Sequence, residues 1–157
     1  MKKLFLIFIA GFIFLAIPAY KAWATNTLTI VPPKAVDLGT INMADYETGY
    51  KEKIRATVLL VKDDTNNWKL MVSTMDSNMG AIGAYIKPIG DFKWRASGSM
   101  ATQLTYTSLT NYGLEAARGL KSGTTNIIYL DYRVLLVWGN DVPGVYNVNI
   151  LYTLTTQ

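Results

Sequence analysis

The stretch that decides the fold is Tyr146–Leu154, which reads YNVNILYTL. Apolar side chains occupy every second position of this stretch, and polar residues fill most of the positions between them. Successive side chains of a strand point to opposite faces, so a period of two predicts a β-strand with one face in the core. The predicted inward residues are Tyr146, Val148, Ile150, Tyr152 and Leu154.

A second alternating segment precedes this strand. Its apolar residues recur at every second position, at Ile128, Leu130, Tyr132, Val134 and Leu136. The residues GNDVPG at 139–144 separate the two segments and are typical of a turn. Two alternating runs joined by such residues predict a β-hairpin.

The first half of the chain carries a similar pair of segments. The polar cluster at 62–67 predicts a turn between them, and both contribute apolar residues at every second position. The predicted inward residues are Ile54, Ala56, Val58 and Leu60 before the turn, and Trp68, Leu70 and Val72 after it. We therefore expect two similar hairpins.

Shorter strands are predicted in the rest of the chain, and residues 114–120 are the one segment predicted to form a helical turn or two. Seven to nine short strands without long helices predict an all-β fold, a two-sheet antiparallel, immunoglobulin-like β-sandwich. The predicted shorter strands are residues 27–31, 35–41, 84–89, 92–96 and 103–106.

Each predicted hairpin contains the run VLLV, at 58–61 and at 134–137, which is apolar on both faces. An antiparallel sandwich buries only one face of each strand, so the second face needs a cover. Either residues 76–124 fold over it, or it is exposed and contacts another protein. The residues of this possible interaction face are Leu59, Val61, Leu135 and Val137.

The N-terminus has the pattern of a secretory signal peptide. Two lysines precede an apolar run from Leu4 to Ala19, and Ala22-Trp23-Ala24 fits the small-residue cleavage rule. We predict a signal peptide at residues 1–24 and a single β-sandwich domain at 25–157. The exported chain is expected at the cell surface or outside the cell, without a membrane segment after cleavage.

Composition excludes many functions. The chain has no Cys and no His, so disulfides, thiolate metal sites and the usual hydrolase triads are absent. Three of the 15 basic residues lie in the signal peptide, which leaves 12 against 11 acidic ones and gives no reason to expect a nucleic acid partner. The adjacent pair Asp63-Asp64 is interpreted as turn chemistry. We predict no enzyme activity, no cofactor and no metal site.

Short motifs resemble the WxL domain family. Trp68-Lys69-Leu70 spells the WxL triplet, and Asp37-Leu38-Gly39 resembles an early element of such domains. At the C-terminus, Tyr146, Ile150 and Leu154 match the family's distal motif, with Leu151 in place of Thr and Tyr152 in place of Trp.

The resemblance implies a secreted, β-rich module of Gram-positive bacteria that attaches non-covalently to the cell wall, binds peptidoglycan and assembles with other surface proteins. The residues that the resemblance makes candidates for binding are Trp68, Leu70, Tyr146, Tyr152 and Leu154. Their alternation allows a second interpretation, in which all five are core residues.

Three classes of function follow. The first is a non-catalytic WxL-like module for wall attachment or for assembly of surface complexes. The alternative is a structural subunit of a pilus or fibre that self-associates by strand exchange, with Thr25–Val31 as the donor segment. A carbohydrate-active enzyme is the third class, and the scattered carboxylates disfavour it.

Overall fold

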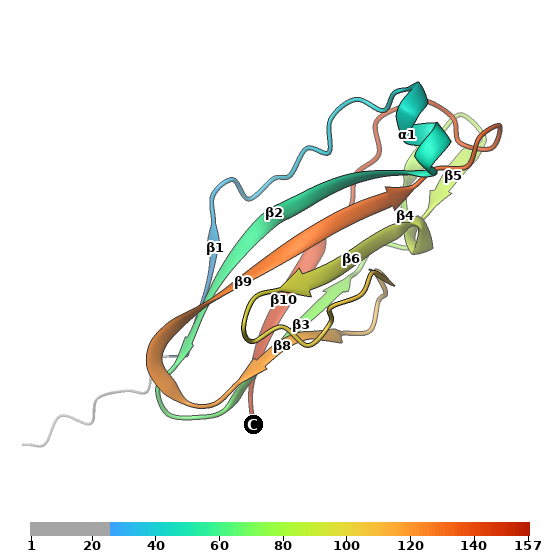
Figure 1. Ribbon diagram of the computed structural model, residues 1–157. Coiled ribbons are helices and arrows are strands. Elements are labelled where there is room, and N and C mark those ends of the chain that lie inside the picture. The colour runs from blue at the N-terminus through green and yellow to red at the C-terminus, as the bar shows by residue number, and fades with distance from the viewer. Residues whose placement is uncertain (1–25) are drawn as a thin grey trace, which may run out of the picture.

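The computed structural model describes residues 26–157, so the predicted signal peptide lies outside the described residues. One antiparallel sheet of five strands and one of three strands face each other across a common core (Figure 1). This arrangement confirms the predicted two-sheet antiparallel β-sandwich. Among residues 26–157, no helix is both long enough and apolar enough to cross a membrane.

The elements follow one another along the chain as β1 (Asn26–Val31), α1 (Met43–Thr48), β2 (Tyr50–Asp63), β3 (Trp68–Thr74), β4 (Asn78–Ile82), β5 (Tyr85–Pro88), the 3₁₀ helix η1 (Ile89–Asp91), β6 (Phe92–Ser97), β7 (Thr107–Ser108), β8 (Leu114–Gly119), β9 (Ser122–Leu135) and β10 (Ile150–Thr156).

The strand order shows that the predicted hairpins are wrong. The larger sheet has the order β1-β2-β9-β6-β7 and the smaller has β10-β3-β8, while β4 and β5 pair separately. The consecutive strands β2 and β3 thus lie in different sheets, as do β9 and β10. Each turn carries the chain from one sheet to the other, which lets the apolar faces of consecutive strands meet across the core instead of lying side by side.

The first of these turns is held by a buried carboxylate. Asp63 has no exposed surface, and its Oδ1 accepts hydrogen bonds from the backbone N–H groups of Asn66 (2.8 Å) and Thr65 (3.0 Å). These donors lower the pKa of Asp63 below its ordinary value. The acidic pair therefore belongs to the turn, as the sequence predicts.

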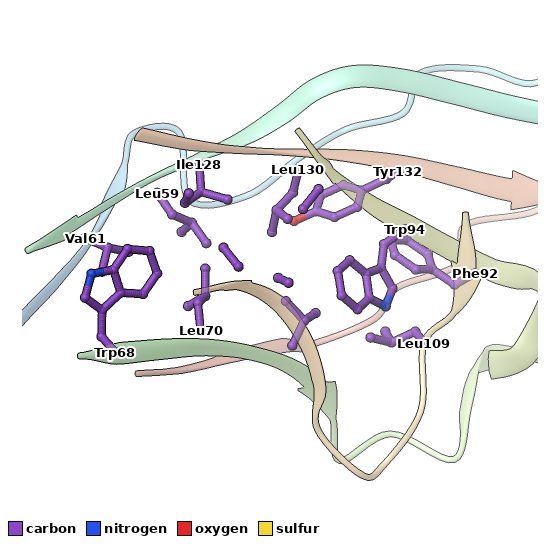
Figure 2. Close-up of a cluster of buried hydrophobic side chains, with 14 of the residues drawn as sticks. Leu59, Val61, Trp68, Leu70, Phe92, Trp94, Leu109, Ile128, Leu130 and Tyr132 are labelled. Carbon is purple, nitrogen blue, oxygen red and sulfur yellow. The ribbon is translucent and has the colours of Figure 1, made fainter. Parts of the chain in front are cut away.

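The core lies between the sheets and has a tryptophan at each end. Figure 2 shows Trp68 beside Val61 at one end and Trp94 beside Leu109 at the other. Neither indole has any exposed surface. Trp68 packs against the backbone of Gly119, where a Cβ atom would lie only 2.4 Å from the ring. The predicted inward residues of β3 and most of those of β9 belong to this core.

The predicted inward face of β2 is wrong, because its odd-numbered residues Thr57, Leu59 and Val61 are the buried ones. A β-bulge lies just before them. Arg55 adopts a positive φ of 50°, and the pairing of β2 with β9 shifts between Lys53 and Thr57. The bulge is fixed by the buried Asp131 of β9, whose Oδ1 accepts a hydrogen bond from the Arg55 backbone at 2.7 Å. Ile54, beside this bulge, is half exposed.

The burial of β2 corrects the predicted interaction face. Leu59 and Val61 are completely buried between the sheets, so they form part of the core and not of an exposed surface. Leu135 is partly exposed at the end of β9, and Val137 is exposed in the following loop. The four residues do not form one continuous face.

Three other local predictions are wrong. Residues 114–119, predicted as a helical turn, form strand β8, which pairs with β3 and buries Ala116 and Ala117 completely. The helix instead lies at α1, where Asn42 and Asp45 form a capping box. Residues 35–41 and 103–106 do not form strands.

Candidate functional site: a groove between the two sheets

A groove of about 1050 Å³ opens between the edges of the two sheets. One wall is the coil at residues 34–41, and the other is the extended segment 141–150 that leads into β10. Thr57, Phe92, Tyr132 and Val134, from three strands of the larger sheet, form its floor. The groove is thus a gap in the sandwich.

The groove remains open because β10 has a neighbouring strand on one side only. β10 pairs with β3 over all seven of its residues, and within residues 26–157 no strand pairs with its other edge. Upstream of β10, the backbone N–H of Asn147 donates to the Met79 carbonyl at 2.8 Å, which continues the pairing on the same side. The opposite edge of residues 145–154 faces the groove.

The inward residues of this segment are only partly buried. They alternate as the sequence predicts and pack against the core on one side, but all five keep exposed surface. A strand beside them would complete their burial. These residues are Tyr146, Val148, Ile150, Tyr152 and Leu154.

The opposite wall likewise pairs with no strand in the part of the chain that the structure describes. Val36 and Leu38 turn their side chains onto the core and are also partly buried. The coil around them is held by Asp37, whose side chain accepts a hydrogen bond from the Gly39 N–H (2.8 Å) and whose carbonyl accepts one from Lys53 Nζ (2.8 Å). Gly39 has a φ of 79°, which a side chain would disfavour.

The polar groups on the floor of the groove are uncharged and partnered. The Tyr132 hydroxyl donates to Thr57 Oγ1 at 2.9 Å and also contacts the Tyr152 hydroxyl. Burial raises the pKa of both tyrosines, so both hydroxyls stay protonated near neutral pH. Because these groups satisfy one another, apolar side chains entering the groove would leave no buried donor without a partner.

One end of the groove holds a charged cluster around Lys87. The Lys87 side chain is 1% exposed, and its Nζ donates to Asp141 Oδ1 at 2.6 Å and to Asp91 Oδ2 at 2.9 Å. Burial raises the pKa of Asp141, but the hydrogen bonds from Lys87, Tyr85 and the Val137 N–H together lower it below its ordinary value. This cluster could not be predicted from the sequence, because Asp141 lies 54 residues from Lys87.

The five residues predicted to bind a ligand divide into two groups. Trp68 and Leu70 have no exposed surface, so they contact only the core. Tyr146, Tyr152 and Leu154 lie along the half-buried row of the groove. Within residues 26–157, no group of three or more side chains from Asp and Glu is placed to hold a metal ion.

No family model and no curated protein matches the sequence. Solved structures do match: the P pilus rod subunit PapA is 13% identical with a TM-score of 0.52, over 83% of this chain and 99% of that chain. A chain from a chaperone–usher pilus is 11% identical with a TM-score of 0.50, over 83% and 87% of the two chains. At these identities the likeness shows the fold alone.

Proposed function

We propose that the protein is a non-catalytic structural subunit of an extracellular fibre, and that its groove is filled by a strand donated by another subunit. The observation that carries this proposal is the edge of β10 that no strand among residues 26–157 pairs with, together with its half-buried inward row. An unpaired strand edge is a template for pairing with another chain, and natural proteins usually protect it. The pilus subunits that share the fold support the same proposal.

A donated strand suits both the shape and the chemistry of the groove. Its backbone would pair with the free edge of residues 145–154, and its alternate side chains would enter the gap between the sheets. Such a strand needs apolar residues at every second position, because the groove is lined mainly by aliphatic and aromatic side chains. Main-chain bonding would supply affinity and the inserted side chains specificity.

We propose the segment Thr25–Val31 of a second copy as the donor. Its described part is β1, an edge strand in which no side chain is fully buried. Leu28 and Ile30 alternate with threonine and are partly buried against the core. To donate this segment, a subunit must release it from β2, where it pairs from Asn26↔Asp63 to Val31↔Val58.

A reversible disulfide lock tests the donor. Thr29 lies opposite Leu60 in the pairing of β1 with β2, and the chain has no cysteine of its own. Facing Cα atoms of antiparallel strands are about 4.5–5.5 Å apart, a distance that a disulfide spans. In the variant Thr29→Cys/Leu60→Cys, the oxidised protein should remain monomeric by light scattering, and reduction should restore polymers.

A second cysteine pair controls for the chemistry of oxidation. Lys69 and Thr155 are paired residues of β3 and β10, so Lys69→Cys/Thr155→Cys locks strands that assembly does not move. This variant should polymerise whether oxidised or reduced. Polymers of the oxidised first variant would refute the donor segment. In that case, loss of polymers when the partly buried Ile150 is changed to Asp would show that a different donor fills the groove.

Cell-wall attachment through a WxL-like domain stays a separate prediction from the sequence motifs. It is tested by sedimentation of the exported protein with isolated Gram-positive walls. The placement of Trp68 in the core changes the choice of variant. Trp68→Ala is expected to destabilise the fold, so exposed residues are the appropriate positions for testing wall contact.

A further inference from the structure

The charged cluster around Lys87 contains one carboxylate more than an ion pair requires. Lys87 on β5 is almost completely buried, and its Nζ contacts three acceptors: the Leu135 carbonyl (2.7 Å), Asp141 and Asp91. One ammonium group therefore faces two carboxylates. A buried ion pair must overcome a large desolvation cost, and the second carboxylate adds a net negative charge.

The carboxyl group of Asp141 is held on both oxygens. Its Oδ2 accepts the backbone N–H of Val137 at 2.6 Å, and its Oδ1 accepts the Tyr85 hydroxyl as well as Lys87 Nζ. The side chain of Asp141 is 5% exposed. Burial raises the pKa of Tyr85, so its hydroxyl stays a donor. The carboxyl carbon is thus fixed beside a lysine nitrogen with hydrogen-bond donors on both oxygens.

We propose that Lys87 and Asp141 form an intramolecular isopeptide bond, with Asp91 as the group that transfers protons between them. Asp91 is suited to this role because it contacts the same Nζ at 2.9 Å and its side chain is 27% exposed. The inference rests on the cluster itself and is independent of the proposed fibre function.

The reaction is a condensation that balances without a further reactant. Asp91 accepts a proton from the ammonium group, and the free amine attacks Cγ of Asp141 to form the C–N bond. The Val137 N–H stabilises the negative charge that develops on Oδ2. Oδ1 takes up the two protons lost by the lysine nitrogen and leaves as water. The products are a neutral amide and one water molecule.

Two physical effects favour the amide in this setting. Groups held in reactive contact have effective concentrations of about 10⁵ M or more. This offsets the tendency of the amide to hydrolyse in water. Condensation also replaces two buried charges by a neutral amide, which removes their desolvation cost. The bond would join residues 54 apart and fasten β5 to the loop that leads into the groove and β10. In a chain without cysteine, it would supply a covalent tie that no disulfide can.

The intact mass of the purified exported protein tests the proposal. The mass should be lower by one water molecule, about 18 Da, than the sequence of the mature chain requires. Trypsin does not cut before proline, so Lys87-Pro88 stays intact, and the expected digest joins peptide 70–93 to peptide 134–157. A folded protein with full mass and two separate peptides would overturn the proposal.

Variants distinguish the isopeptide from other losses of water. Asp141→Asn should lose ammonia, about 17 Da, because the leaving group is then the amide nitrogen. Asp141→Ala and Lys87→Met should keep their full mass, and Asp91→Asn should slow the mass change while Asp91→Glu restores it. Lys51→Met is the matched control, since Lys51 and Asp45 form an ion pair of 3.0 Å with more exposed side chains. Dehydration that persists in Lys87→Met would refute the assignment.

Discussion

Two neighbouring residues of β10 provide a matched test of the groove. Ile150 points inward, where it is partly buried, and Leu151 points outward with 40% of its surface exposed. Both are aliphatic residues of the same size on the same strand. Ile150→Ala and Leu151→Ala therefore remove equal volumes from opposite faces.

The structure sets the size of the expected difference. Isoleucine to alanine removes three carbon groups, each worth about 0.8 kcal/mol when fully buried. Because Ile150 is only partly buried in the free subunit, roughly 1 kcal/mol of this gain remains to be realised when a strand fills the groove. That amount corresponds to about a fivefold weaker donor interaction at each junction.

The assay is the protein concentration at which half of the chains are polymerised, measured by light scattering. Ile150→Ala should raise this concentration about fivefold, and Leu151→Ala should change it less than twofold. Thermal unfolding of the free subunits shows how much of the effect is lost stability. Equal shifts for the two variants, or none for Ile150→Ala, would refute burial of the inward face on assembly.

Three further predictions concern stability. Gly119→Ala should cost about 1–3 kcal/mol in the free energy of unfolding, because its Cβ would overlap the Trp68 ring, while Gly123→Ala, with open space around it, should change little by denaturant titration. The pKa of Asp63 is lowered on folding, so its contribution to the free energy of unfolding is present above the ordinary pKa of 3.8 and is lost as the pH falls through the lower folded value. The melting temperature should therefore drop more on acidification for the wild type than for Asp63→Asn. Arg55→Val should be less stable than Arg55→Gly by about 1–2 kcal/mol, because φ is positive there, and equal unfolding free energies would contradict a strained bulge.

Alternation in the sequence predicted the strands and faces where the chain is regular. In residues 128–136 and 146–154, the apolar side chains at every second position face inward as the period of two requires. Residues 54–60 do not, because the run VLLV is apolar on both faces, and which face is buried depends on the sheet that packs against it. A pattern read along one strand carries no information on that packing.

The groove was not predictable for a related reason. The sequence identified Tyr146, Tyr152 and Leu154, but it gave no sign that their inward face is only half covered. Coverage depends on which strand lies next to β10, and both predicted hairpins placed the wrong strands side by side. The Lys87 cluster depends in the same way on contacts between distant segments.

Hydrogen–deuterium exchange tests the central claim most directly. Backbone amides in residues 145–154 should exchange in two groups in the free subunit, because one edge of this segment pairs with the smaller sheet and β4 and the other faces the groove. In assembled protein, the fast-exchanging amides of this segment should become protected, together with amides of the opposite wall at residues 34–41. Polymers in which both walls exchange as fast as in the free subunit would contradict the filling of the groove by a donated strand.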